Sequence, residues 1–214
     1  MEKYLMEKES IIQAGKDMLA NDWTVGTWGN ISVRSNDGEN VIITPSGVDY
    51  EVITTEMMSV ADMKGNLISG KKPSIELELH TKIYLNRPDV NAVVHVHSPY
   101  TCAFACTRTN IPPVFDEMAQ IIGGEVKTAK YAIPGTSELA NNCVDALGDK
   151  MATLLANHGG VAVGKTLEEA LKVTEVLEKS LQSYAIAKSF GTPVALDDAA
   201  VDMMRDFFLN KYGK

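Results

Sequence analysis

Three histidines of this 214-residue chain have the spacing of a metal site. His95 and His97 lie two positions apart in the apolar segment 92–97 (AVVHVH), and His158 follows a second apolar segment and precedes two glycines. On a β-strand, residues i and i+2 point to the same side, and glycines let a ligand or another backbone come close. The alternative is a pair of strand histidines bonded to backbone groups, but one buried face that carries both imidazoles needs polar partners. The pattern favours a catalytic zinc ion that keeps a fourth position open.

An acidic residue is predicted near the start of a helix. Pro73 and Ser74 are typical of a helix N-terminus, which puts Glu76 in the first turn, where the helix dipole stabilises a carboxylate. By spacing alone, Glu76 is therefore either an ordinary exposed glutamate or an acid that the helix carries to the histidines. His80 lies four residues further along the same helical face, and we interpret it as a packing or supporting residue rather than a ligand.

Two glycine-containing turns, at 26–30 (GTWGN) and 44–47 (TPSG), have the composition of anion-binding loops. Each can direct backbone N–H groups at an anion, although either turn alone is more often only a turn. Neither has the spacing of a Walker loop or of a dinucleotide-binding fingerprint. Taken together with Ser74, the two turns predict a small cradle for a phosphate group.

The elements that must position these residues follow from apolar periodicity and from turn residues. Helices are predicted at 4–21, 73–86, 136–147, 166–190 and 197–212, and another opens at Ser98. Strands are predicted at 31–34, 41–44, 58–62, 92–97, 126–133, 151–157 and 161–163. Strands in the middle of the chain with helices at both ends predict an α/β fold, a mainly antiparallel sheet with helices on both faces. We see no linker or repeat, so we expect one domain over residues 1–214.

Composition limits the classes of partner. The net charge of −8 and the lack of any basic stretch argue against nucleic-acid binding, but they allow a small phosphorylated substrate. No segment has the apolar length of a signal peptide or a membrane span. Cys102, Cys106 and Cys143 are odd in number and form no C-x-x-C pair, which indicates core packing and a reducing compartment. We expect a cytoplasmic protein.

The motifs also match a known family in order and spacing along nearly the whole chain. The sequence resembles the class II aldolase family, which includes sugar-phosphate aldolases and epimerases. The matching segments are 26–32 (GTWGNIS), 44–47 (TPSG), 72–76 (KPSIE), 92–97 (AVVHVH) and 156–159 (ANHG). The resemblance implies a central antiparallel sheet flanked by helices, and a homotetramer with active sites at the subunit interfaces.

The resemblance also implies a role for each site residue. His95, His97 and His158 would bind Zn²⁺, and Glu76 would be both the fourth ligand and the acid/base. The residues implied to bind the substrate phosphate are Thr27, Gly29, Asn30, Ser46, Gly47 and Ser74. The implied reaction is reversible cleavage of a ketose 1-phosphate, of the L-fuculose 1-phosphate type, to dihydroxyacetone phosphate and a small aldehyde. Zinc would act as a Lewis acid that stabilises the enediolate.

The chain departs from the family pattern at a few positions. Ile75 replaces the second of two serines that commonly precede the glutamate, and Pro134 replaces a phenylalanine. A tyrosine that the aldolases supply from a neighbouring subunit is absent from 115–118, where Glu117 lies instead. The C-terminal tyrosine is matched by Tyr212. Glu117 and Tyr212 are therefore the candidate proton donors for the aldehyde oxygen, and the aldehyde specificity stays open.

Other activities of the same family remain alternatives. The epimerases, which act on ribulose 5-phosphate, usually carry aspartate where this chain has Glu76. The methylthioribulose-1-phosphate dehydratases carry a catalytic glutamate in a setting similar to that of Glu117. A zinc-stabilised scaffold without activity, like the adducin head domain, is the third alternative. Because such domains lose ligands while this chain keeps all of them, we favour an enzyme.

Overall fold

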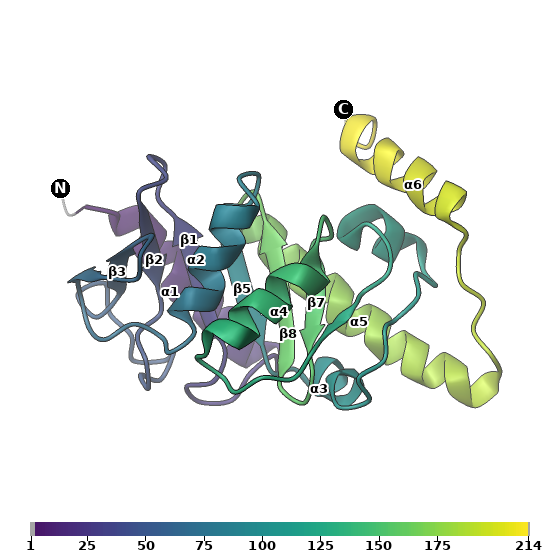
Figure 1. Cartoon of the computed structure of the whole chain (residues 1–214), viewed down its shortest axis with the longest axis horizontal. Helices are drawn as coiled ribbons and strands as arrows, with labels where there is room; N and C mark the ends of the chain where they lie inside the picture. The colour runs from purple at the N-terminus through teal and green to yellow at the C-terminus, as the bar shows by residue number, and fades with distance from the viewer. Residues whose placement is uncertain (1–2, 214) are drawn as a thin grey trace.

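The computed structural model describes residues 3–213, which are built around one eight-stranded sheet (Figure 1). The strands are β1 (Asn30–Arg34), β2 (Asn40–Ile43), β3 (Ser59–Asp62), β4 (Leu67–Ser69), β5 (Ala92–Val96), β6 (Thr128–Ala129), β7 (Ala152–Leu155) and β8 (Gly159–Gly164). Their order is β4-β3-β2-β1-β5-β8-β7-β6, and every pair is antiparallel except β6 and β7. β5 therefore lies inside the sheet, between β1 and β8.

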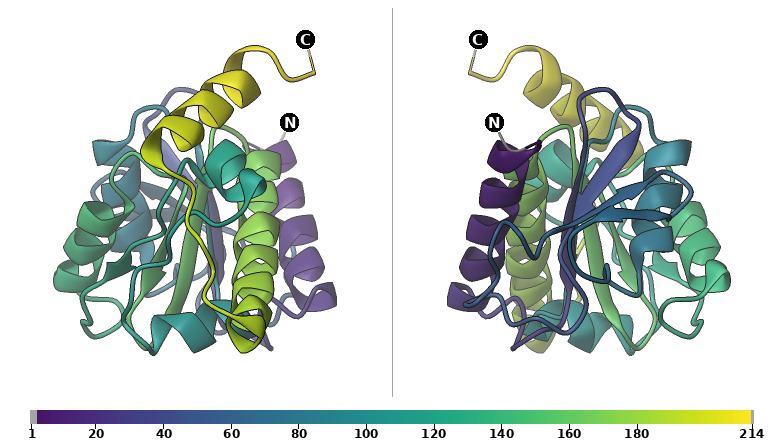
Figure 2. Two further views of the ribbon diagram at one scale, coloured as in Figure 1. Left: turned by 90° about the vertical axis from the view of Figure 1, so that its right-hand side faces the viewer. Right: turned by 90° about the vertical axis from the view of Figure 1, so that its left-hand side faces the viewer.

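Helices cover both faces of the sheet. They are α1 (Leu5–Ala20), α2 (Leu77–Asn86), α3 (Pro99–Ala105), α4 (Ser137–Leu147), α5 (Leu167–Phe190) and α6 (Asp198–Asn210), with a π-helical turn η1 (Met118–Ile122). Figure 2 shows α1 and α5 on one face and α2 and α4 on the other. The predicted fold class, a mainly antiparallel sheet flanked by helices, is confirmed.

Alternation along β5 decides which side chains reach which face. Val94 and Val96 belong to the apolar cluster that includes Ile11 of α1, whereas Val93 belongs to the cluster on the α2 and α4 side. Because successive side chains of a strand point to opposite faces, His95 lies on the same side as Val93, toward α2. All five residues of β5 are buried, as expected for a strand with helices on both faces.

The start of α2 differs from the prediction. The helix begins at Leu77, and Glu76 is its N-cap residue instead of lying one turn inside it. The preceding segment continues the sheet, since Pro73 forms a bridge with Pro45 and the Ser74 N–H donates to the Thr44 carbonyl at 3.1 Å. These backbone contacts delay the helix by a few residues and leave Glu76 at its N-terminus.

Other boundaries also differ. The strand predicted at 126–133 contains only the two residues of β6, because Val126 instead bridges to Ile111. The prediction missed β4, an exposed edge strand, and η1, which ends at Gly123 with φ 94°. α6 packs mainly on η1 and buries only Val201, and it projects from one end of the molecule in Figure 1. Within residues 3–213, none of the helices combines the length and apolar character needed to cross a membrane.

Candidate metal centre

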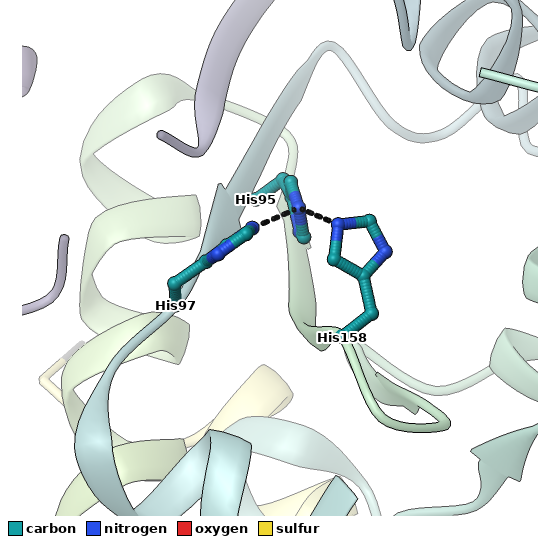
Figure 3. Close-up of side chains that lie close together, drawn as sticks. All are labelled: His95, His97 and His158. Atoms are coloured by element: carbon teal, nitrogen blue, oxygen red, sulfur yellow. Dashed lines mark hydrogen bonds between the residues drawn. The ribbon is translucent and has the colours of Figure 1, made fainter. Parts of the chain in front are cut away.

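The three predicted histidines meet at one end of β5. His95 is in β5, His97 comes just after its last residue, and His158 is in the tight turn between β7 and β8. Figure 3 shows the three imidazoles pointing toward one another, and one nitrogen from each lies within 4.8 Å of the others. Asn157 precedes His158 with φ 56°, a left-handed turn conformation that asparagine tolerates and that aims the next residue back at β5.

The distances between nitrogens are those of metal ligands. The Nε2 atom of His95 lies 2.9 Å from Nε2 of His97 and 3.3 Å from Nε2 of His158. The Oε2 atom of Glu76 lies 3.3 Å from the same His95 nitrogen. A tetrahedral zinc ion with metal–nitrogen distances of about 2.0–2.1 Å separates its ligand atoms by about 3.3 Å. The distances from His95 to the other three groups are therefore close to those between the corners of a zinc tetrahedron.

Hydrogen bonding decides which imidazole nitrogen faces this centre. Nδ1 of His95 lies 2.9 Å from the Gly160 carbonyl oxygen, which only accepts, so Nδ1 carries the proton and donates it. The Nε2 lone pair of His95 therefore points at the centre. Burial, followed by the neighbouring imidazoles, lowers the pKa of His97 to about 3 and that of His158 to about 4. Both rings are neutral at pH 7, as metal ligands must be.

Glu76 supplies the negative charge of the centre. Burial raises its pKa, but the imidazoles of His95 and His158 and a hydrogen bond from Asn30 outweigh burial and lower the pKa below its usual value. The Asn30 amide nitrogen lies 2.9 Å from Oε2, and its hydrogen bond favours the ionised carboxylate. Oε1 is buried without a hydrogen-bond partner among residues 3–213. A buried carboxylate that faces the lone pairs of imidazole nitrogens forms an environment that stabilises a bound cation.

Two glycines allow the segments around the centre to approach. A Cβ at Gly159 would come 2.3 Å from the Val96 carbonyl oxygen and 3.3 Å from the rings of His95 and His97. A Cβ at Gly29, where φ is 71°, would come 2.5 Å from the His95 carbonyl oxygen. Side chains at these positions would push β8 and the 26–29 loop away from β5, so glycine is required for the histidines to converge.

Two of the predicted phosphate-binding segments lie side by side. The Ser46 N–H donates to the Lys72 carbonyl at 2.9 Å, and Ser74 is tied to Thr44 as described above. The Thr44 N–H donates to the carbonyl of Ile31, the residue after Asn30, and the Thr44 hydroxyl oxygen accepts from the Ile31 N–H. Segments 44–47 and 72–74 therefore meet the start of β1, next to the histidines.

The other predicted phosphate residues differ in accessibility. Thr27 and Gly47 are exposed and Gly29 is half-buried, and both glycines have positive φ. Asn30 is buried, and both ends of its amide are occupied: the nitrogen by Glu76, and the oxygen by His80. The sequence did not predict this pairing of Asn30 with His80, although His80 was expected to lie outside the ligand set.

The two candidate proton donors lie elsewhere in the chain. Glu117 and Tyr212 line a common cavity between η1, α5 and α6, together with Phe115 and Lys179. None of the histidines, all of which lie within the described residues, lines this cavity. Tyr212 is 63% exposed. Glu117 and Tyr212 therefore line one cavity, and the histidines lie outside it.

The fold and the three-histidine site together define a class II aldolase-type protein. The sequence profile of the family described as Class II Aldolase and Adducin N-terminal domain matches residues 9–185. The chain belongs to this family.

Individual relatives differ in their reactions. The 5-deoxy-D-ribulose 1-phosphate aldolase of Bacillus thuringiensis is 36% identical over 203 residues, which cover 94% of this chain and 95% of that protein. The 3-oxo-tetronate 4-phosphate decarboxylase of Haemophilus influenzae is 35% identical, and the match covers 84% of this chain and 87% of that protein. A solved structure of an L-fuculose 1-phosphate aldolase is 36% identical, with a TM-score of 0.93, over 96% of this chain and 97% of that one. The family is shared, while the substrate varies.

Proposed function

We propose that this protein is a zinc-dependent lyase that reversibly cleaves a ketose 1-phosphate to dihydroxyacetone phosphate and a small aldehyde. The observation that carries the proposal is the meeting of three imidazole Nε2 atoms with the Glu76 carboxylate at ligand spacing. Relatives that act on 5-deoxy-D-ribulose 1-phosphate and L-fuculose 1-phosphate support the choice of substrate class.

In this proposal, His95, His97 and His158 hold the zinc ion, and Glu76 is the fourth ligand of the resting enzyme. Zinc supplies a Lewis acid that stabilises negative charge on the substrate oxygens. Glu76 removes and returns the proton at the carbon next to the carbonyl. Its Oε1 atom, buried without a hydrogen-bond partner among residues 3–213, is the base that the geometry leaves free.

The phosphate of the substrate is proposed to lie against the 26–30 and 44–47 turns and Ser74. Gly29 and Gly47 have the positive φ that opens backbone N–H groups to an anion, and Ser46 and Ser74 add hydroxyls. Asn30 contributes by holding Glu76, because both ends of its amide already have partners. Ile75 is 58% exposed and leaves an apolar side chain where family aldolases commonly offer a serine hydroxyl.

We further propose a homotetramer in which one subunit completes the site of its neighbour. The support is the separation of Glu117 and Tyr212 from the histidines of their own chain, which a neighbouring copy would close. In the condensation direction, either residue would then donate the proton that the aldehyde oxygen gains, and in cleavage it would take back the proton that this hydroxyl loses. A tyrosine hydroxyl suits this step because it is neutral near pH 7, whereas a glutamate needs a raised pKa.

A substrate screen tests the proposal. The zinc-loaded protein is given L-fuculose 1-phosphate, 5-deoxyribulose 1-phosphate and methylthioribulose 1-phosphate, and release of dihydroxyacetone phosphate is measured. The unphosphorylated sugars serve as controls, and we expect them to react far more slowly. L-Ribulose 5-phosphate and 3-oxo-tetronate 4-phosphate are tested in the same way. Water loss from methylthioribulose 1-phosphate or epimerisation of L-ribulose 5-phosphate, without triose release, would replace cleavage by that reaction. Carbon dioxide release from 3-oxo-tetronate 4-phosphate, which forms the triose phosphate without any aldehyde, would assign a decarboxylase if no ketose 1-phosphate is cleaved.

A further inference from the structure

A line of polar side chains runs behind the metal centre, between α2 and β1. Glu76, His80 and Tyr84 are four residues apart and share one face of α2. Asn30 and Ser32 are two residues apart and share the α2-facing side of β1, where Asn30 lies opposite His95 in the adjacent strand. All five are buried, with at most 4% of each residue exposed. Such burial requires every polar atom to be satisfied.

Hydrogen bonds join these five side chains end to end. The Asn30 amide nitrogen lies 2.9 Å from Oε2 of Glu76, and its amide oxygen lies 2.5 Å from Nε2 of His80. The Ser32 hydroxyl lies 2.6 Å from Nδ1 of His80 and 2.6 Å from the Tyr84 hydroxyl. The line therefore begins at Tyr84 and ends on the carboxylate that faces the histidines.

The chemistry of the partners fixes the direction of every bond. A carboxylate only accepts, so the Asn30 NH₂ group faces Glu76 and the amide oxygen faces His80. That oxygen only accepts, so His80 carries its proton on Nε2 and presents the Nδ1 lone pair to Ser32. Ser32 donates its one hydroxyl proton to His80, so the proton between Ser32 and Tyr84 comes from Tyr84, whose hydroxyl also lies 3.0 Å from the Ser32 carbonyl oxygen. All donors point the same way, toward Glu76, and bonds aligned in this manner polarise one another.

An amide in the line restricts what the line can do. Asn30 has no proton to exchange near pH 7, so a proton on Glu76 cannot pass through it to His80. The line of hydrogen bonds therefore orients Glu76 but does not carry its proton away. Oε2 is held by Asn30, which leaves Oε1 without a hydrogen-bond partner among residues 3–213.

We propose that His80 is a positioning residue for Glu76. By donating from Nε2, His80 locks the Asn30 amide in the one orientation that gives Glu76 an N–H donor instead of a repelling carbonyl oxygen. The consequence for turnover rests on the proposed role of Glu76 as the acid/base, but the orientation of Asn30 does not.

Two amide replacements at His80 separate positioning from packing. His80→Gln puts a side-chain NH₂ group near the place of Nε2 and can still donate to Asn30, whereas His80→Asn reaches only to the place of Nδ1. We expect His80→Asn to lower kcat by about 10- to 100-fold with little change in KM, and His80→Gln to restore most of the loss. Thr174→Val, which removes a buried hydroxyl bonded to the Ala170 carbonyl far from the line, is the control for the loss of a buried polar group.

Nitrogen NMR of the histidines tests the orientation without any turnover. The chain has only four histidines, so each ring can be assigned in ¹⁵N-histidine-labelled protein, with His80→Gln identifying the signal of His80. We expect His80 in the Nε2–H form before and after zinc is added, while the other three rings change on zinc binding. In His80→Asn, zinc affinity measured by chelator competition should fall by about 10-fold, since Glu76 loses its support.

The outcomes distinguish this inference from the proposed function. An Nδ1–H form of His80 would mean that Asn30 is turned the other way, and it would overturn the inference whatever the enzyme does. Equal losses in His80→Gln and His80→Asn would reduce His80 to a packing residue. If no sugar phosphate is cleaved but His80 has the Nε2–H form and zinc affinity responds as expected, the positioning stands and the reaction must be reassigned.

Discussion

Single hydrogen bonds influence the chemical state of two groups in the metal centre. The bond from His95 Nδ1 to Gly160 exposes the Nε2 lone pair, and the bond from Asn30 favours the ionised form of Glu76. The H-x-H spacing is a local pattern that brought out His95 and His97, whereas Glu76 was implied by the family resemblance and was left open by its position at a helix start. The sequence did not predict their partners, because the Gly160 carbonyl and the Asn30 amide come from segments that only the sheet brings together.

At Glu76, we predict that replacement by glutamine separates metal binding from turnover. Glu76→Gln keeps the size of the side chain and an oxygen that accepts from Asn30, so the fold and most zinc binding should persist. The amide cannot take a proton, and kcat should fall by about 10²- to 10⁴-fold. The measurements are the zinc content and kcat of the variant. Turnover close to that of the wild type would mean that Glu76 only caps the helix.

For His97 and His158, we predict a stability that depends on pH in the metal-free protein. Their pKa values in the folded chain, about 3 and about 4, lie below the ordinary value of about 6.5 in the unfolded chain. Between about pH 6.5 and about pH 3 the unfolded chain therefore binds more protons at these two rings, so their contribution to stability should fall as the pH is lowered through this window and should be constant above it.

The measurement is the Tm of chelator-treated protein as a function of pH. His97→Gln is the comparison, because it removes one titrating ring and leaves all carboxylates in place. We expect a shallower fall of Tm for this variant. Identical slopes would show that His97 does not titrate differently in the folded and unfolded chains.

At the scale of elements, the long strands and helices follow from apolar periodicity and the short ones do not. β5 and α5 are predicted nearly to their ends, because burial on a regular pattern specifies them. β4 is exposed along all three residues, so no pattern marks it, and β6 is limited by the bridge that diverts Val126. Glu76 moved to the N-cap because a tertiary bridge at Pro73 outweighed the local preference for an earlier helix start.

Contact between β5 and β8 leads to a prediction for Gly159. A Cβ there would lie 2.3 Å from the Val96 carbonyl oxygen, so Gly159→Ala must separate the two strands beside the histidines. We expect a loss of about 1–3 kcal/mol in the free energy of unfolding and about a tenfold weaker zinc affinity. Gly191→Ala, with nothing within 4 Å, is the matched control and should change neither.

At the scale of the whole molecule, the position of the donors predicts that active sites are shared. Glu76→Gln and Tyr212→Phe chains are each expected to be poorly active as homomeric assemblies. When the two are unfolded, mixed and refolded together, about one quarter of the sites should combine an intact Glu76 with an intact Tyr212 of a neighbour. Activity should recover to that fraction.

The control for this experiment is the same mixing with His95→Ala in place of Tyr212→Phe, since His95 and Glu76 lie in one chain. That pair should recover nothing. Recovery with Glu117→Gln but not with Tyr212→Phe would assign the donor to Glu117, and activity retained by both donor variants would place the donor elsewhere.

The central place of β5 in the sheet also determines when the metal can arrive. β5 is hydrogen-bonded on both sides, and its buried neighbours position the ligands through polypeptide contacts alone. Unlike a zinc finger, whose ligands are scattered until the ion collects them, this chain should fold first and load afterwards. A chelator should then remove zinc and activity while the far-ultraviolet circular dichroism stays unchanged, and added zinc should restore the enzyme without a refolding step. In a cell, the supply of zinc would then control the fraction of this enzyme that is active, and not the fraction that is folded.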